Sequence, residues 1–375
     1  MKRRSLFIII AAVAVAGIAI TEISTLHDKL RRNRELQLGS RYLTDLSSLE
    51  PIDAHTHIFQ GSPDFSAMLT RLHVHVLDIL YVDDTDPYLR SLETQRTDAL
   101  NFVSSNPGHA KLCTSFNPFD VRNADSAKTA VHDLHKDFAR GAVAAKIWKN
   151  VGMEIVDQSG KYVLPDDPRF EEIYRDLAAQ NKTLIIHAGD PDEAWGIQSP
   201  WGFASKYYDS NPQWNMALKR GAAKPKDILD AVDRVLMRHP DLRVIGAHFG
   251  SLEDHLDELA PRLDRYPNFA VDTAARFRRL VFQPNDQVRA FILKYQDRIL
   301  YGTDLHRFPN RADNFDPSSW ERQYTLDWRY LATSDTFDYQ GHQTQGLDLP
   351  REVLRKIYHD NAIRWIPGLE DRSGQ

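Results

Sequence analysis

Four apolar runs in this chain each end on a residue that can bind a metal ion. The runs end at His55 and His57, at His187, at His248 and at Asp304. Each run reads as a buried β-strand, and in a barrel of parallel strands all the C-terminal ends open onto one face. Side chains that lie far apart in the sequence would meet on that face. The pattern therefore predicts a fold and a metal centre together.

The order of apolar and amphipathic segments predicts the rest of that fold. Strands are expected at 52–57, 74–82, 111–117, 142–148, 183–187, 243–248, 268–272 and 298–304, and helical stretches such as 170–180, 225–238 and 284–295 separate most of them. Alternating strands and helices indicate a parallel sheet, and eight such units fit a (β/α)₈ TIM barrel. The tail from 349 to 367 reads as a closing helix that packs on the barrel.

A long segment at 189–224 follows the fifth strand on the expected active-site face. It is rich in Pro, Gly and aromatic residues, among them Trp195. Long loops at this face are often functional lids, although a rigid surface insertion has the same composition. Trp195 is our candidate for a substrate contact from this loop.

The first candidate strand carries the motif His55-Thr56-His57. Side chains alternate along a strand with period two, so both imidazoles point to the same side and can bind one ion. A catalytic zinc ion takes about three His or carboxylate ligands and keeps one position open. His55, His57, His187 and Asp304 supply that set.

A second His-x-His motif, His73-Val74-His75, serves as an internal control. It stands at the start of its strand, so it should lie at the opposite end of the barrel and bind no metal.

Composition limits the other chemistry. The net charge is −5, and Lys and Arg are mixed with Asp and Glu along the chain. No basic stripe is present, so we expect no nucleic-acid partner. Cys113 is the one cysteine, which excludes an internal disulfide and a Cys-rich zinc site. A metal ion must therefore be held by His and carboxylate side chains.

The N-terminus reads as a separate unit. Three basic residues, Lys2-Arg3-Arg4, precede the apolar run 6–20. This pattern is typical of a signal peptide or membrane anchor, and both possibilities stay open. We therefore expect segment 1–20 to target the chain, 21–49 to form a helical spacer and 50–375 to form the barrel. The body would lie outside the cytoplasmic membrane, in the periplasm or another extracytoplasmic space, and would be membrane-bound if the segment is uncleaved. A homo-oligomer is also compatible with the sequence.

The motifs in combination resemble the amidohydrolase-2 family, the branch of the amidohydrolase superfamily that includes aminocarboxymuconate-semialdehyde decarboxylase. The resemblance covers about residues 50–367, including the closing segment 356–362. It implies that His55, His57, His187 and Asp304 hold one divalent ion, usually Zn²⁺. It also implies that His248 lies beside the water that the metal activates.

Several further residues could contact a substrate. Lys146 stands at the end of the fourth strand and is open to three interpretations: a carbamylated bridge between two metals, a contact to a substrate carboxylate or to a ligand, and an ordinary structural lysine. Arg276 follows the seventh strand and could bind an acidic substrate. His306 lies in the loop above the eighth strand, from which it could reach the substrate.

These residues predict a metal-dependent hydrolase acting on a small amide, ester or lactone. His248 would shuttle a proton, since imidazole titrates near neutral pH, and Asp304 would bind the metal and accept a proton. The resemblance also permits non-oxidative decarboxylation of an aromatic or enolic acid. A third possibility is an exported barrel that binds a ligand without turnover.

Overall fold

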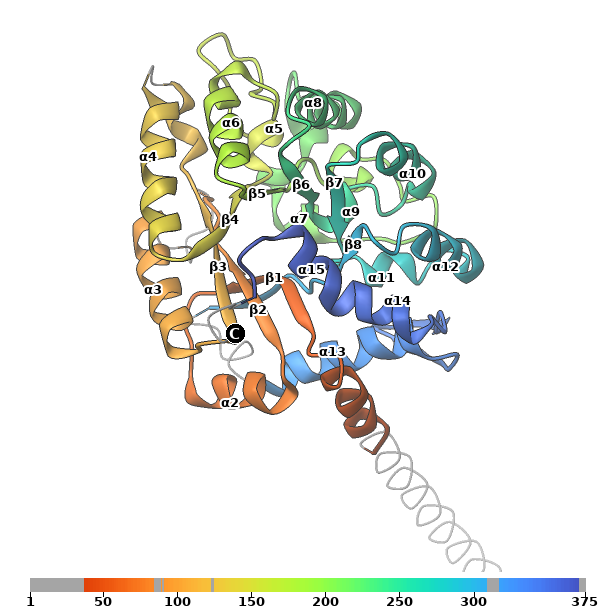
Figure 1. Ribbon diagram of the computed structural model, residues 1–375. Coiled ribbons are helices and arrows are strands. Elements are labelled where there is room, and N and C mark those ends of the chain that lie inside the picture. Colours follow the sequence, from red (N-terminus) through yellow and green to blue (C-terminus); the bar gives the residue numbers. More distant parts are fainter. Residues whose placement is uncertain (1–36, 84–88, 90, 123–124, 309–316, 371–375) are drawn as a thin grey trace, which may run out of the picture.

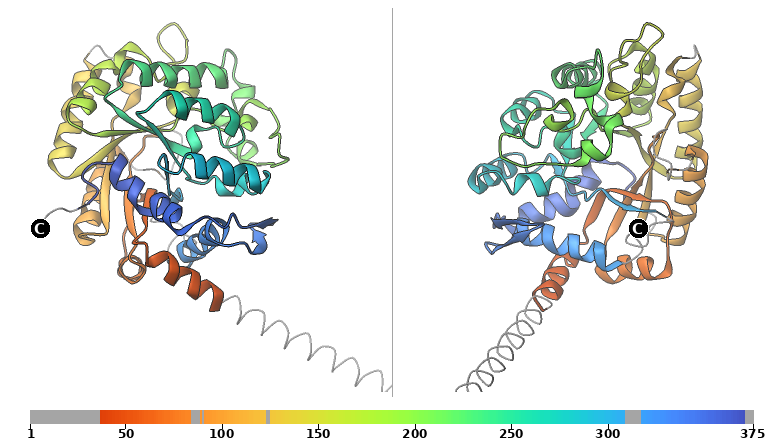
Figure 2. Two further views of the ribbon diagram at one scale, coloured as in Figure 1. Left: turned by 45° about the vertical axis from the view of Figure 1, so that its right-hand side comes forward. Right: turned by 180° about the vertical axis from the view of Figure 1, so that it is seen from behind.

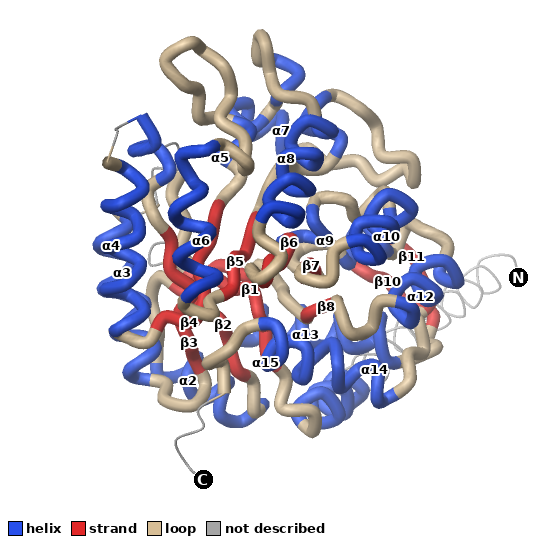
Figure 3. The backbone as a smooth tube through the Cα atoms, turned by 45° about the horizontal axis from the view of Figure 1, so that its top comes forward, coloured by secondary structure: helices blue, strands red, loops and turns tan. Residues whose placement is uncertain are grey.

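The computed structural model describes residues 37–83, 89, 91–122, 125–308 and 317–370. Its centre is a curled parallel sheet with helices around it, which is the predicted TIM-barrel architecture (Figure 1). Figure 3 shows the strands gathered inside a surround of helices. The strand order is β8-β7-β6-β5-β4-β3-β2-β1-β9, so each of the first eight strands lies beside its neighbour in sequence.

The strands are short and begin and end close to the predicted positions. They are β1 Ile52–Ile58, β2 His75–Ile79, β3 Ala110–Ser115, β4 Ala142–Ile147, β5 Thr183–Ile186, β6 Arg243–Gly246, β7 Phe269–Asp272, β8 Ile299–Leu300 and β9 Leu305–Arg307. The expected second and eighth strands were too long, and residues 305–307 form a strand where a loop was expected.

Helices cover the outer face of the sheet in both further views (Figure 2). The longer ones are α2 Pro63–Leu72, α3 Leu92–Ser105, α4 Ser126–Ala139, α6 Glu171–Ala179, α8 Pro225–Arg238, α10 Leu256–Arg265, α12 Asn285–Lys294 and α13 Pro317–Ala332. Single turns of helix are α5 Asn150–Met153, α7 Tyr207–Ser210, α9 Ala247–Gly250 and α11 Phe277–Leu280. Short 3₁₀ turns are Pro118–Arg122, Pro168–Phe170, Asp192–Trp195, Pro212–Trp214 and Met216–Leu218.

Helix α8 illustrates why these segments form helices and pack inward. Pro225 occupies its first turn, where the missing N–H costs nothing. Its buried residues recur at helical spacing, so one apolar face meets the sheet. They are Ile228, Ala231, Val232, Val235 and Leu236.

The barrel closes between its first and last strands. Ala54 N donates a hydrogen bond to Tyr301 O at 2.9 Å, and Asp304 N donates to His55 O at 2.8 Å. Gly302 lies at this seam, where an added Cβ would stand 2.8 Å from His55 Cβ. A glycine is therefore required for the two strands to approach this closely.

The C-terminal part adds a hairpin beside α12 and α13 and a closing helix at the N-terminal ends of the barrel strands. An antiparallel hairpin, β10 Thr336–Tyr339 and β11 His342–Gln345, is followed by α14 Arg351–Arg355, a π-helical turn Lys356–Asp360 and α15 Asn361–Trp365. Trp365 and Ile366 pack into the apolar cluster of the barrel interior. The closing helix predicted from the sequence is therefore present.

The predicted targeting segment, residues 1–20, lies outside the described residues, as does most of the spacer. Residues 37–47, the first described part of the spacer, are helical. Within the described ranges, no helix is both long and apolar enough to cross a membrane.

Candidate metal centre and cavity

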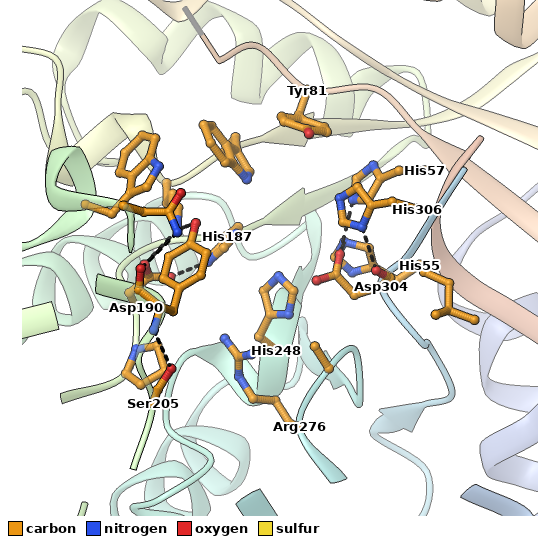
Figure 4. Close-up of a pocket in the computed structure, with 18 of the residues that line it drawn as sticks. His55, His57, Tyr81, His187, Asp190, Ser205, His248, Arg276, Asp304 and His306 are labelled. Atoms are coloured by element: carbon orange, nitrogen blue, oxygen red, sulfur yellow. Dashed lines mark hydrogen bonds and ion pairs between the residues drawn. The ribbon is translucent and has the colours of Figure 1, made fainter. Parts of the chain in front are cut away.

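Strand β1 delivers two imidazoles to one carboxylate. His55 Nε2 lies 3.7 Å, and His57 Nε2 3.3 Å, from Asp304 Oδ1 (Figure 4). The other ring nitrogens are anchored: His55 Nδ1 lies 2.7 Å from Asp272 Oδ2, and His57 Nδ1 donates to Ile79 O at 2.6 Å. Anchoring of Nδ1 directs Nε2 toward the centre, as in metal sites.

Asp304 reaches this position through an unusual backbone conformation. Its φ is 62°, in the left-handed region, which a non-glycine residue adopts at a cost of about 1 kcal/mol or more. Burial alone would raise the pKa of its carboxyl group, but His248, His57 and other nearby imidazoles hold that pKa well below its usual range. Asp304 is therefore an ionised carboxylate at the centre of the site.

His248 follows β6 and is fixed by two contacts. Its Nδ1 donates to Ala274 O at 2.9 Å, and its backbone N–H donates to Asp272 Oδ1 at 2.8 Å. Its ring centroid is 4.9 Å from that of His55, and His55, His248 and Asp304 together have metal-ligand spacing. Burial lowers the pKa of His248 well below its ordinary value. Because Nδ1 donates to a carbonyl oxygen, Nε2 is the ring nitrogen that faces other partners.

His187, the predicted fifth-strand ligand, faces another partner. Its Nε2 lies 3.1 Å from Asp190 Oδ1, and Asp190 Oδ2 accepts a 2.7 Å hydrogen bond from Lys149 Nζ. Burial lowers the pKa of His187 to about 3. The ring of His187 still lies close to the centre, because its centroid is 4.2 Å from that of the His248 ring. In the described part of the chain, His187 belongs to neither of the two clusters with metal-ligand spacing, which are His55–His248–Asp304 and His57–Asp304–His306.

Lys146 lies against the candidate ligands. Its side chain is buried, its Nζ is 3.4 Å from His55 Nε2, and burial lowers its pKa. This contact favours the interpretation of Lys146 as a residue that supports a ligand over that of an ordinary structural lysine.

A cavity of about 780 Å³ opens above these residues. Aromatic side chains form much of its wall: Tyr81, Trp148, Tyr207, Tyr208, Trp214 and Phe308. Arg276 and Arg278 also line the cavity, and Figure 4 shows the Arg276 side chain next to His248. Arg276 is buried, and its Nε lies 3.0 Å from Glu253 Oε1. The volume is within the range of small-molecule sites, about 300–1,000 Å³.

The two other residues predicted to contact a substrate, His306 and Trp195, line different hollows in the structure. His306 lines the cavity, but it lies on β9 and not in a loop. Trp195 lines a different hollow, with Pro225 and Leu252, and its Nε1 donates to Ala223 O at 2.8 Å. This position does not support a substrate contact by Trp195, because the loop folds its indole away from the cavity.

Three charged residues of the site were not assigned a role from the sequence. Asp272 ends β7 after an apolar run, which is the same signal that identifies the other strand ends. Asp190 and Lys149 gave no such signal. Lys149 is buried, and its amine pairs with Asp190 across 41 residues of sequence. Burial alone would lower the pKa of Lys149, but Asp190 raises it.

His73 and His75 lie where the control predicts. His75 begins β2 and pairs with Ile52, the first residue of β1. His73 is the C-cap of α2, two residues before β2 begins. Both histidines therefore lie on the side of the N-terminal strand ends, opposite the candidate metal centre.

Solved structures with similar folds match most of this chain. An uncharacterised TIM-barrel protein from Bordetella bronchiseptica is 15% identical, with a TM-score of 0.52, over 85% of this chain and 99% of that chain. A 2,6-dihydroxybenzoate decarboxylase from Rhizobium is 15% identical, with a TM-score of 0.47, over 84% and 98%. A 5-carboxyvanillate decarboxylase from Novosphingobium aromaticivorans is 13% identical, with a TM-score of 0.46, over 84% and 95%. The Bordetella match supports the barrel fold.

No curated protein matches the chain significantly. The family model described as Amidohydrolase matches residues 52–367, which include β1 to β9 and the closing helix. The imidazoles and the carboxylate of the centre fit a divalent metal, on which this family depends. The chain therefore belongs to the amidohydrolase-2 family.

Proposed function

We propose that this protein is a metal-dependent hydrolase that cleaves a C–N or C–O bond in a small amide, ester or lactone. The observation that carries the proposal is the position of the Asp304 carboxylate, within 3.3 Å of His57 Nε2 and 3.7 Å of His55 Nε2. A carboxylate beside two imidazoles whose Nδ1 atoms are anchored is a ligand set for a divalent cation.

His55, His57 and Asp304 would hold the ion, and His187 would join them if its side chain turns from Asp190. The donor set suits Zn²⁺, although imidazole and carboxylate ligands also bind other divalent ions. A bound ion of this kind lowers the pKa of water and polarises a substrate carbonyl.

His248 is the proposed proton shuttle. Its Nδ1 hydrogen is committed to Ala274 O, so Nε2 is the atom that can take a proton and return it to the leaving group. The buried ring cannot rotate without losing this bond, which keeps Nε2 oriented toward the substrate. Asp304 would accept the first proton, because its carboxylate is ionised beside His248.

Arg276 and Arg278 supply the proposed site for an acidic group of the substrate. Glu253 engages Nε of Arg276 at 3.0 Å, which leaves the two terminal nitrogens of the guanidinium available to a carboxylate in the cavity. A charge-assisted pair of this type is strong and directional.

Non-oxidative decarboxylation is a second candidate, favoured by the aromatic wall of the cavity. The rings of Tyr81 and Trp148 lie 4.9 Å apart, as do those of Trp148 and Trp214. Such a wall suits a planar aromatic or enolic acid whose carboxylate pairs with Arg276. The same metal centre would then support decarboxylation in place of hydrolysis.

We further propose that the body is exported and stays outside the cytoplasmic membrane, because Lys2-Arg3-Arg4 precedes the apolar run 6–20. Fractionation of the source cell tests this proposal. Full-length protein found only in the cytosol would contradict it.

An exported barrel could also bind a ligand without turnover, and the activity assay below distinguishes this rival function from an enzyme.

The decisive experiment is an activity screen of the metal-loaded protein. Lactones, amides, esters and aromatic carboxylic acids are each assayed for hydrolysis and for CO₂ release, with Zn²⁺ and Mn²⁺ supplied separately. Metal-dependent hydrolysis that is lost on chelation supports the proposal, and CO₂ release without hydrolysis supports the second candidate. Tight ligand binding with no metal and no turnover would overturn both. His132→Ala, on the exposed face of α4, controls for the removal of a histidine.

A further inference from the structure

Strand β9 brings a fourth histidine to the metal centre. Immediately after Asp304, residues Leu305–Arg307 run parallel to the end of β1, with His57 and His306 in the same register. Side chains in register on neighbouring parallel strands point to the same face. The two rings accordingly lie side by side, with centroids 4.5 Å apart and planes inclined by 31° (Figure 4).

Hydrogen bonds fix which nitrogen each ring presents. His306 Nδ1 lies 2.8 Å from Asp304 O, and His57 Nδ1 lies 2.6 Å from Ile79 O. A carbonyl oxygen only accepts, so each Nδ1 must carry the hydrogen and each Nε2 keeps a free lone pair. This is the arrangement of a metal-binding imidazole, whose second nitrogen donates to a carbonyl or carboxylate.

The spacing of the acceptor atoms matches a cation site. One ligand atom from each of His57, Asp304 and His306 lies within 4.8 Å of the others. Ligand atoms in a tetrahedral zinc site, with bonds of about 2.0–2.1 Å, are ~3.3 Å apart. The distance from His57 Nε2 to Asp304 Oδ1 is 3.3 Å.

We propose that His306 is a further ligand, through Nε2, of the divalent cation that His57 and Asp304 bind. The sequence assigned His306 to substrate contact, and His306 is outside the ligand set that the family resemblance implies. The inference rests on the metal binding of the proposed function but on neither of its reactions.

Cobalt(II) titration tests the proposal, because Co²⁺ takes zinc-type ligands and reports them spectroscopically. Full-length protein is stripped with a chelator and titrated with Co²⁺, and paramagnetically shifted imidazole N–H resonances are recorded by NMR. We expect His306→Ala to weaken Co²⁺ binding by at least about 10–100-fold, a range known for the loss of residues that only support metal ligands. One shifted N–H resonance, that of His306 Nδ1, should also disappear.

Two variants keep the result interpretable. His306→Gln preserves much of the side-chain volume, in case the alanine variant does not fold, and it should lose the same resonance. His132→Ala should match the wild type. If both His306 variants keep wild-type affinity and every shifted resonance while His55→Ala loses the metal, the inference is wrong and the proposed function survives. If the wild type binds neither Co²⁺ nor Zn²⁺, both fail together.

Discussion

The two oxygens of Asp272 hold two different histidines of the site. Oδ2 lies 2.7 Å from His55 Nδ1, and Oδ1 accepts the backbone N–H of His248 at 2.8 Å. Burial alone would raise the pKa of Asp272, but His55 and Lys146 lower it. One ionised side chain at the end of β7 therefore orients a candidate metal ligand and the candidate proton shuttle.

Replacing Asp272 should weaken metal binding without removing a ligand. Asp272→Asn keeps the shape of the side chain but loses the charge that fixes the His55 tautomer. We expect metal affinity to fall by about 10–100-fold, measured by competition with a chelating dye. Asp257→Asn, on the exposed side of α10, should leave affinity unchanged. Equal affinities for the wild type and Asp272→Asn would show that Asp272 does not position His55.

Removal of His248 should separate proton transfer from metal binding. We expect His248→Ala to lower kcat by about 10²–10⁴, the usual contribution of a positioned acid–base group, with bound metal nearly unchanged by elemental analysis. His55→Ala should instead lose metal. His248 also has ligand spacing to His55 and Asp304. An empty site in His248→Ala, with normal activity per remaining ion, would identify His248 as a ligand and contradict the shuttle.

Arg276 should matter for acidic substrates only. Arg276→Gln removes the guanidinium charge beside His248, and a charged hydrogen bond contributes about 1.5–3 kcal/mol. We expect KM for carboxylate-bearing substrates to rise by about 10–100-fold, while neutral esters of the same compounds keep theirs. Arg322→Gln, exposed on α13, is the control. Equal changes for acids and esters would argue against a carboxylate contact.

Asp327 should make the protein less stable as pH rises. Its carboxyl group accepts hydrogen bonds from Tyr301, Tyr339 and Gln323, yet burial raises its pKa to about 6. An unfolded aspartate titrates near ~3.9. Between these two pH values the folded chain holds a proton that the unfolded chain has released, so stability present below about pH 4 is lost as pH rises through about 6.

Urea unfolding of the wild type and Asp327→Asn between about pH 4 and pH 7 checks this pH dependence. The difference in unfolding free energy between them should change by on the order of 2 kcal/mol across the window. Asp338→Asn, exposed on the β10–β11 hairpin, should follow the wild type. Parallel pH profiles for the wild type and Asp327→Asn would contradict the raised pKa.

The sequence predicted the barrel and most of the centre because both follow from local patterns. Apolar runs give strands, and a polar residue that closes such a run must lie at the C-terminal face. His55, His57, His248 and Asp304 were found in this way, and the structure gathers them.

Features that depend on backbone turns and distant partners could not be predicted. The left-handed conformation of Asp304 redirects the chain into β9, and no pattern of residues in the sequence predicts this conformation. The orientation of His187 depends on Asp190, which in turn depends on the buried Lys149. Trp195 illustrates the same limit, because an aromatic residue in a long loop can face either the cavity or the loop's own interior.

The hydrogen bond from Asp304 N to His55 O joins the last strand region to the first. A cation bound by the side chains of the same two residues would link the first and last strand regions a second time. Ligand binding to the native state raises the free energy of unfolding by RT ln(1 + [L]/Kd), so the bound ion would stabilise the closed barrel. Chelation should then loosen the molecule from β1 and β8 outward, and amide exchange should accelerate there before it accelerates in β4 and β5.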